Sequence, residues 1–167
     1  MLKPWGERKF DFGYPEWMAP FFIERFSGTP ARLADKLSNV NKVINIRPVD
    51  DKWSIQEHAG HFIKVEELWR KRFIEFEEGA KELTAADMTG KRVWDANYNE
   101  MDLNNILDEF RKSRAQLVEF LFKKEFEYFS YKAFHPRLKT DMTPVDLIYF
   151  ACEHDDYHLA VITEMLK

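Results

Sequence analysis

The chain has 167 residues, of which 45% are hydrophobic and 32% charged, with a formal net charge of −4 at pH 7. This length suits a single domain with its own core, and the composition excludes wholly disordered, collagen-like and low-complexity classes. The mildly acidic balance, with basic residues interspersed among acids, argues against nucleic acid as a partner.

Cysteine usage and the N-terminal sequence bear on the compartment. Cys152 is the only cysteine, which excludes an intrachain disulfide and an all-cysteine zinc site. Residues 1–8 lack the apolar core of a signal peptide, and no apolar run approaches the ~20 residues that span a bilayer. We therefore expect a cytoplasmic protein with no membrane partner.

The first part of the chain carries strong helix signals and only weak strand signals. An apolar segment covers residues 16–26, and Thr29 followed by Pro30 is typical of a helix N-cap and first helical residue. The helix that opens there is expected to continue to about Val43.

A capping box predicts the next helix. The Ser54 hydroxyl can accept from the third helical amide while the Glu57 carboxylate reaches back. Apolar residues spaced by three, four or seven then indicate a long helix to about Glu78. Residues 80–99 should form a long connection with at most a short helical turn; its candidates for lining a pocket are Arg92, Trp94, Asn97 and Tyr98.

Two more helices are predicted in the second half of the chain. Asp102 caps a helix whose apolar stripe continues to Leu121. Residues 126–141 then form a second loop region. Thr143, with Pro144 as the first helical residue, opens a final helix that runs nearly to the end of the chain.

Four substantial helices, each with one apolar stripe, bury those stripes best in an all-α four-helix bundle. We expect one domain over residues 1–167, with residues 1–28 as an N-terminal extension that packs on the bundle. The long connections before Asp102 and before Thr143 argue against the simplest short-loop version. Aromatic residues make up 16% of the chain, which fits an aromatic-rich core or rings that line a ligand pocket.

The five histidines are His58, His61, His135, His154 and His158. His154 and His158 are four residues apart, so both imidazoles lie on one helix face, about 6 Å apart along the axis. That spacing suits two ligands of one metal, although a buried hydrogen-bonded pair or a partly exposed pair are ordinary alternatives. His61, on another helix, could complete a set of three with positions free for water or substrate. His58 is the competing candidate.

Familiar catalytic motifs are absent from the sequence. Residues 154–158 resemble the metalloprotease H-E-x-x-H motif but have Asp in place of Glu. The sequence has no phosphate-binding loop, dinucleotide-binding motif or G-x-S-x-G motif, and no repeated Glu-x-x-His of a di-iron bundle.

Two stretches together resemble the DinB/YfiT-like superfamily. They are residues 53–61, WSIQEHAGH, and residues 153–162, EHDDYHLAVI. The family pattern has Trp-Ser near a helix start, a ligand His eight residues after the Trp, and a closing H-x-x-x-H helix. Trp53 and His61 match that spacing, and the resemblance extends from about Thr29 to the end of the chain.

The resemblance implies an up-down-down-up bundle with one long crossover. It also implies a divalent metal, zinc or nickel in most relatives, bound near one end of the bundle by His61, His154 and His158. His58 falls on no ligand position of the pattern. Dimers are common among relatives, so a homodimer is one expected assembly.

Characterised relatives include thiol S-transferases that use bacillithiol or mycothiol, whereas others are described only as metal-dependent hydrolases. The expected function is therefore activation of a low-molecular-weight thiol cosubstrate for S-transfer to an electrophilic small molecule. A metal bound by three neutral ligands would lower the pKa of a thiol or water. Two alternatives are a hydrolase that uses water, and a non-catalytic metal-binding or interaction bundle. An open coordination position beside a pocket would favour an enzyme.

Other polar residues near the motifs have two interpretations each. Glu57 could orient a ligand or act as a base, but its capping-box position is sufficient to explain it. Asp155 or Asp156 could accept the outer N–H of a ligand histidine, and the other would be solvated surface. His135, in a loop before a proline, could reach the mouth of the site, but a loop histidine is usually exposed. Cys152 is expected to be a small core residue.

Overall fold

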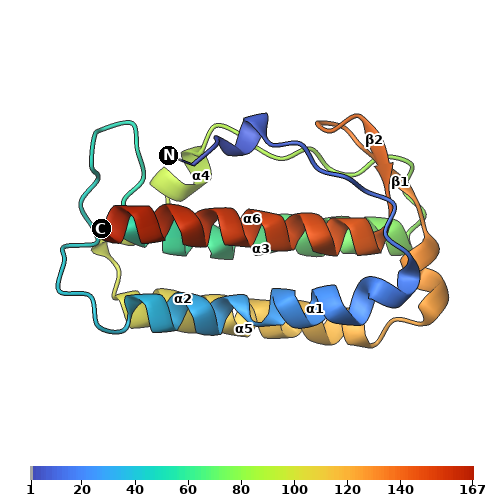
Figure 1. The fold of residues 1–167 in the computed structure, drawn as a ribbon, viewed down its shortest axis with the longest axis horizontal. Coiled ribbons are helices and arrows are strands. Elements are labelled where there is room, and N and C mark those ends of the chain that lie inside the picture. The colour runs from blue at the N-terminus through green and yellow to red at the C-terminus, as the bar shows by residue number, and fades with distance from the viewer. Residues whose placement is uncertain (1) are drawn as a thin grey trace.

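The computed structural model describes residues 2–167, and its long helices form a bundle (Figure 1). In Figure 1 the α1–α2 rod and α6 run in one direction and α3 and α5 in the other, so the topology is up-down-down-up. The predicted all-α four-helix bundle is confirmed. The bundle helices are α1 (Ala19–Ser27), α2 (Thr29–Leu37), α3 (Ile55–Glu77), α5 (Leu103–Phe122) and α6 (Pro144–Leu166).

The connection between α3 and α5 crosses the length of the bundle. Because these two helices are parallel, the chain must return to the starting end between them. The return passes over α3 and α6 (Figure 1) and contains only α4 (Lys91–Trp94) and a 3₁₀ turn at Tyr98–Glu100. The long connection with a short helical turn is as predicted.

The loop region predicted over residues 126–141 contains regular structure that the sequence did not indicate. After a 3₁₀ helix at Phe126–Ser130, β1 (Ala133–His135) pairs antiparallel with β2 (Thr140–Met142). Backbone hydrogen bonds then join Phe134 of β1 to residues 81 and 83 of the crossover. Strands this short give no readable alternation, which is why sequence periodicity missed them.

Two details of the first helices differ from the prediction. Thr29 is not an N-cap: α1 passes into α2 through Gly28, and the Thr29 hydroxyl donates instead to Asp155 Oδ2 at 2.7 Å. The helix also ends at Leu37, not at Val43, since Ser38 tightens the last turn by bonding to the Asp35 carbonyl through both its amide and its hydroxyl.

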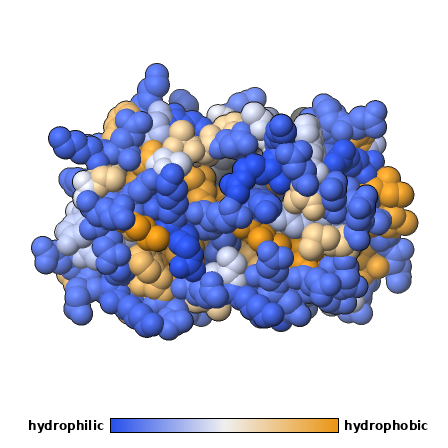
Figure 2. All heavy atoms as spheres, turned by 180° about the vertical axis from the view of Figure 1, so that it is seen from behind, coloured by the Kyte–Doolittle hydropathy of each residue, from blue (hydrophilic) through white to orange (hydrophobic). Residues whose placement is uncertain are grey.

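Apolar side chains from all the long helices fill the bundle. Seen from behind, the opposite face of the molecule is mainly hydrophilic, with separate hydrophobic patches (Figure 2). Within the N-terminal segment, Trp5 packs on Phe150 with ring centroids 5.2 Å apart, so residues before α1 cover part of α6. No helix among the described residues is long and apolar enough to cross a membrane.

An arginine lies inside the bundle, paired with two carboxylates. Arg114 on α5 is 1% exposed and bonds to Glu66 on α3 at 2.6 Å and Asp155 on α6 at 2.8 Å. Its guanidinium also lies over the Phe26 ring of α1, 3.4 Å from the ring centroid. One side chain therefore bridges four helices, and the two carboxylates offset the cost of burying its charge.

Replacing Arg114 with Met should destabilise the protein by about 3–5 kcal/mol, because Glu66 and Asp155 would be left buried without their cation. Urea unfolding followed by circular dichroism measures the change. Arg111→Met is the matched control, since Arg111 lies on the same helix and pairs only with exposed Asp108. Equal unfolding free energies for the two variants would contradict this role for Arg114.

Candidate metal centre

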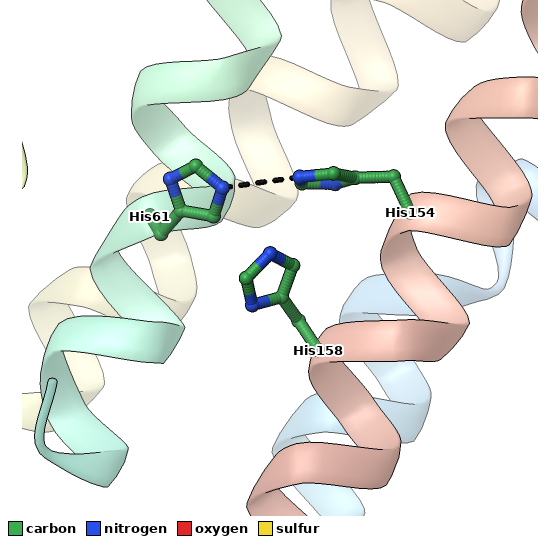
Figure 3. A group of neighbouring side chains, drawn as sticks. All are labelled: His61, His154 and His158. Carbon is green, nitrogen blue, oxygen red and sulfur yellow. Dashed lines mark hydrogen bonds between the residues drawn. The ribbon is translucent and has the colours of Figure 1, made fainter. Parts of the chain in front are cut away.

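Three imidazoles from two helices converge between α3 and α6 (Figure 3). His61 extends from α3, and His154 and His158 extend from α6. One nitrogen of each ring lies within 4.8 Å of the other two, and the Nε2 atoms of His61 and His154 are 3.1 Å apart. The structure thus brings together the three residues that the family resemblance implied. Their role as metal ligands stays a prediction.

Capping boxes define the starts of both helices. Ser54 Oγ accepts from the Glu57 amide at 3.0 Å, and the Ser54 amide donates to the Glu57 carboxylate at 2.9 Å. Thr143 and Asp146 form the same motif before α6, as predicted. Because the first residue of each helix is set in this way, the helical period determines which side chains face the interior.

Two of the three imidazoles, those of His61 and His158, are neutral at pH 7. Burial, together with the neighbouring imidazoles, lowers the pKa of His61 and of His158 well below the ordinary value. Each neutral ring carries one nitrogen lone pair, and lone pairs that converge in a desolvated site repel unless a proton or a cation lies between them. Two nitrogens bound to one tetrahedral zinc lie about 3.4 Å apart, close to the 3.1 Å between His61 and His154. The donor set therefore fits a divalent metal.

The Nδ1 atoms of His61 and His154 face away from the three nitrogens that converge. Nδ1 of His61 and Nδ1 of His154 are buried and have no hydrogen-bond partner. Asp155 Oδ1, also unpartnered, lies 3.9 Å from His154 Nδ1. Burial opposes ionisation of Asp155, but the Arg114 charge holds the pKa of its carboxyl below the usual value. This carboxylate is therefore placed beside the outer N–H that His154 would carry as a ligand.

Asp156 differs from its neighbour, which settles the alternative that the sequence left open. It is partly exposed and pairs with Arg25 and Arg32 on the outer side of α6. Asp155 is the carboxylate beside the cluster, and Asp156 belongs to a surface ion-pair network.

His58 contacts the outer nitrogen of His158. Its Nδ1 lies 3.0 Å from Nδ1 of His158, so one of the two atoms donates and the other accepts. In Figure 3 one nitrogen of His158 points toward His61 and His154 and the other points away. If the inward Nε2 carries the lone pair, Nδ1 carries the proton and donates to His58. Burial lowers the pKa of His58 to about 4, so its ring is a neutral acceptor that orients His158.

A cavity of about 1030 Å³ opens onto the cluster. All four of these histidines line it, together with parts of α3, α6, the crossover and β1. Rings flank the cluster: Trp53 packs on His61 with centroids 4.7 Å apart, and Trp5 on His154 at 5.2 Å. Trp5 lies in the N-terminal segment, far from the motifs, and no sequence signal connects it to the site.

The remaining candidate residues fall into two groups. Arg92 and Trp94 of the crossover line the cavity, whereas Tyr98 is buried against Gly60 of α3 and serves packing. His135 was expected to be exposed, but it is 1% exposed and lines the cavity. The expectation was wrong because the residue belongs to β1, which packs on α6 through the Phe150 ring.

Two residues near the motifs have structural roles. Glu57 belongs to the capping box, as interpreted from the sequence, and also pairs with Arg47, whose hydrogen bonds lower the pKa of its carboxyl against the effect of burial. Cys152 is fully buried, as predicted, and its thiol donates to the Phe22 carbonyl at 3.4 Å. Burial raises the pKa of that thiol, which argues against a nucleophilic role.

Comparisons with known proteins identify the family and the fold of the chain. The family model described as the DinB superfamily matches residues 25–162. Among solved structures, one match is titled "YfiT from Bacillus subtilis is a probable metal-dependent hydrolase with an unusual four-helix bundle topology". Its TM-score is 0.77 at 17% sequence identity, over 95% of this chain and 91% of that one, which shows a shared fold. A search of curated proteins found no match.

The metal-free protein should lose stability as the pH falls from 7 to 5. Unfolded histidines titrate near pH 6.5, whereas burial holds the pKa of His58 and of His135 at about 4. Between these values the unfolded chain binds more protons than the folded one, so the free energy of unfolding decreases with decreasing pH.

Urea midpoints measured in a chelator at pH 7, 6 and 5 check this expectation. The variant His58→Phe should show a smaller decrease than the unmodified protein, because one titrating group is removed. A midpoint that stays constant or rises between pH 7 and 5 would show that these imidazoles are accessible to protons in the folded state.

Proposed function

Because the chain belongs to the DinB superfamily, we propose that His61, His154 and His158 bind a divalent metal ion that serves a reaction in the adjoining cavity. The observation that carries the proposal is a set of three imidazole nitrogens, one from each ring, within 4.8 Å of one another. No further Cys, Asp or Glu of the described residues joins the set, and the cavity opens onto it. Three protein ligands with an open side are typical of catalytic sites, whereas structural zinc sites are closed by a fourth ligand.

Zinc or nickel is the metal that we propose. Imidazole nitrogen is a good ligand for both ions, whereas magnesium and calcium prefer oxygen ligands. None of the three ligands brings a negative charge, so the full charge of a divalent ion would act on whatever occupies the open side. An ion bound there would lower the pKa of a thiol or water and favour its anion at neutral pH.

The reaction that we propose is S-transfer from a low-molecular-weight thiol to an electrophilic small molecule. The thiol loses its proton, its sulfur forms a bond to an electrophilic carbon, and the leaving group departs with the electrons of the broken bond. A cavity of about 1030 Å³ exceeds the space that one small ligand needs, which supports a site for two molecules.

The surroundings of the cluster favour a thiol over water as the nucleophile. A thiol ionises near neutral pH without a strong base, whereas hydrolytic sites commonly use a nearby carboxylate to deprotonate water. The carboxylates among the cavity-lining residues are exposed ones, namely Asp51, Glu67 and Asp87. Asp155 lies behind His154 and is engaged by Arg114 and Thr29.

Hydrolysis is the second candidate. The description of YfiT as a probable metal-dependent hydrolase supports it, because that protein shares this fold. The two candidates use the same metal and differ only in the nucleophile, so one assay distinguishes them.

We expect zinc- or nickel-loaded protein to join a small thiol to an electrophilic aromatic compound such as 1-chloro-2,4-dinitrobenzene, with release of chloride. Absorbance of the thioether product measures the rate. His154→Ala should lower that rate by about 100-fold, because a metal ligand is removed. Arg111→Met, on the far surface of α5, should leave it unchanged.

Ester cleavage by the metal-loaded protein without any thiol would instead favour the hydrolase. Rates equal to those of the buffer for both substrate classes, or equal rates for His154→Ala and the unmodified protein, would contradict a catalytic role for the cluster with these substrates.

A further inference from the structure

Another part of the cavity contains buried nitrogen donors that have no acceptor. Arg72 and His135 are each 1% exposed and Trp69 is 2% exposed, and all three line the cavity. Arg72 Nη2, His135 Nε2 and Trp69 Nε1 have no hydrogen-bond partner. Buried donors without an acceptor are rare in folded proteins because each loses its hydrogen bonds to water, so three around one cavity require an explanation.

Arg72 carries a buried charge without a carboxylate. Its Nε donates to the Thr84 carbonyl at 2.9 Å, and its guanidinium lies 5.5 Å from the centroid of the Trp69 ring. The charge of Glu75, one turn further along α3, raises the pKa of Arg72, but both Glu75 oxygens accept from Thr84 and no ion pair with Arg72 forms. Burial lowers the pKa of Arg72 to about 10, which still leaves the group charged at neutral pH.

The two buried arginines of the bundle therefore differ. Arg114 bonds to two carboxylates, whereas Arg72 bonds to one backbone carbonyl. Proteins rarely bury a charge without pairing it, because the lost hydration must be replaced. The missing partner of Arg72 is an anion.

The β-hairpin contributes further donors to the same region. His135 Nδ1 accepts from the Leu138 amide at 3.2 Å, so the proton of this neutral ring lies on Nε2, the unpartnered atom. Arg137 lies close by, with its guanidinium 5.7 Å from the Phe150 ring on which His135 also packs. Burial and the charges of Arg72 and Arg137 lower the pKa of His135 to about 4. Arg72, His135 and Arg137 all line the same cavity.

We propose that Arg72 and His135, with Trp69 and Arg137 beside them, bind an anionic group of the cavity's ligand, either a carboxylate or a phosphate. A guanidinium fork matches the paired oxygens of both groups, and the indole and imidazole N–H supply additional donors. Water could accept these hydrogen bonds, but only an anion also balances the guanidinium charge. A cation is excluded because the groups are donors or positively charged.

The position of this anion site indicates which class of substrate the cavity would bind. This inference about the substrate rests on the proposed function. Arg72 follows His61 by eleven residues, or about three turns, so both lie on one face of α3. The Trp69 ring separates the two ends, since its centroid lies 5.7 Å from that of His154 and 5.5 Å from the Arg72 guanidinium. The ligand would be an elongated acid whose reacting end lies at the three histidines and whose acidic end lies at Arg72. Apolar rings of Trp69 and Phe150 line the cavity between them.

Calorimetric titration with matched probes tests the anion site. The probes are 4-phenylbutyrate, 3-phenylpropyl phosphate and the neutral 4-phenylbutyramide, each added to zinc-loaded and to chelator-treated protein. We expect one or both acids to bind about tenfold or more tightly than the amide, because a charged group gains a charge-assisted hydrogen bond. The acid that binds more tightly identifies the anionic group.

Variants on α3 supply the control. Arg72→Met should remove the preference for the acids and should fold, since a methionine removes a buried unpaired charge. Arg70→Met should retain the preference, because Arg70 bonds to Gln116 away from the cavity. If Arg72→Met does not fold, two other measurements test the anion site. They are the loss of the acid preference in His135→Phe and the difference in affinity between acid and amide for the unmodified protein.

Equal affinities for acids and amide in the unmodified protein, or a preference that survives Arg72→Met, would overturn the proposal. Titrations of the chelator-treated protein test the anion site independently of metal binding. An acid preference that persists without metal supports the anion site even if no metal is ever bound. Metal binding without any acid preference would overturn the anion site alone.

Discussion

Imidazole nitrogens that meet in a desolvated site need a proton or a cation between their lone pairs. One nitrogen of each of His61, His154 and His158 lies in such a group, and those of His61 and His154 are 3.1 Å apart. The surroundings hold these rings in place. Capping boxes set the starts of α3 and α6. His58 bonds to the outer nitrogen of His158, and the Asp155 carboxylate lies beside the outer nitrogen of His154. The bundle thus brings together one nitrogen from each of three imidazoles, an arrangement that fits the donor set of a three-histidine metal site.

The bundle core and the cluster are physically connected through Asp155. One of its oxygens bonds to Arg114 and Thr29, and the other faces His154. Arg114 in turn contacts Glu66 and Phe26, so the carboxylate beside the cluster is held by residues from α1–α2, α3 and α5. A polar network at the centre of a bundle is costly to bury, and here it holds an orienting carboxylate in position.

Arg114 and Arg72 are both buried, but only one of them has a role that the fold explains. Both are 1% exposed, yet only Arg114 has carboxylate partners. The paired arginine is explained by the fold alone. The unpaired one lines the cavity, with further unsatisfied donors nearby, and is explained by a ligand that brings the acceptor.

Local signals in the sequence were sufficient for the starts of α3 and α6 and for the pair of histidines on α6. The capping boxes at Ser54 and Thr143 and the four-residue spacing of His154 and His158 depend on neighbours along the chain. His61 was distinguished from His58 only by the family resemblance, whose pattern has a ligand eight residues after the tryptophan. Features set by tertiary contacts could not be found in this way.

The misread residues share that dependence on distant partners. The Thr29 hydroxyl, which the sequence suggested as an N-cap, donates to Asp155 on α6. His135 is buried because it lies in a hairpin of two short strands. The spacing of Arg72 from His61 placed both on one face of α3, but a charged residue on a helix is usually solvated. Only its burial without a carboxylate makes it informative.

The most direct measurement of the central claim is X-ray diffraction from crystals of the zinc-loaded protein, with data collected on both sides of the zinc absorption edge. The account predicts a single strong anomalous peak about 2.0–2.1 Å from Nε2 of His61, His154 and His158. His154→Ala crystals soaked in the same way should lack it. Full occupancy by zinc elsewhere, with the three imidazoles hydrogen-bonded only to one another or to water, would contradict the account.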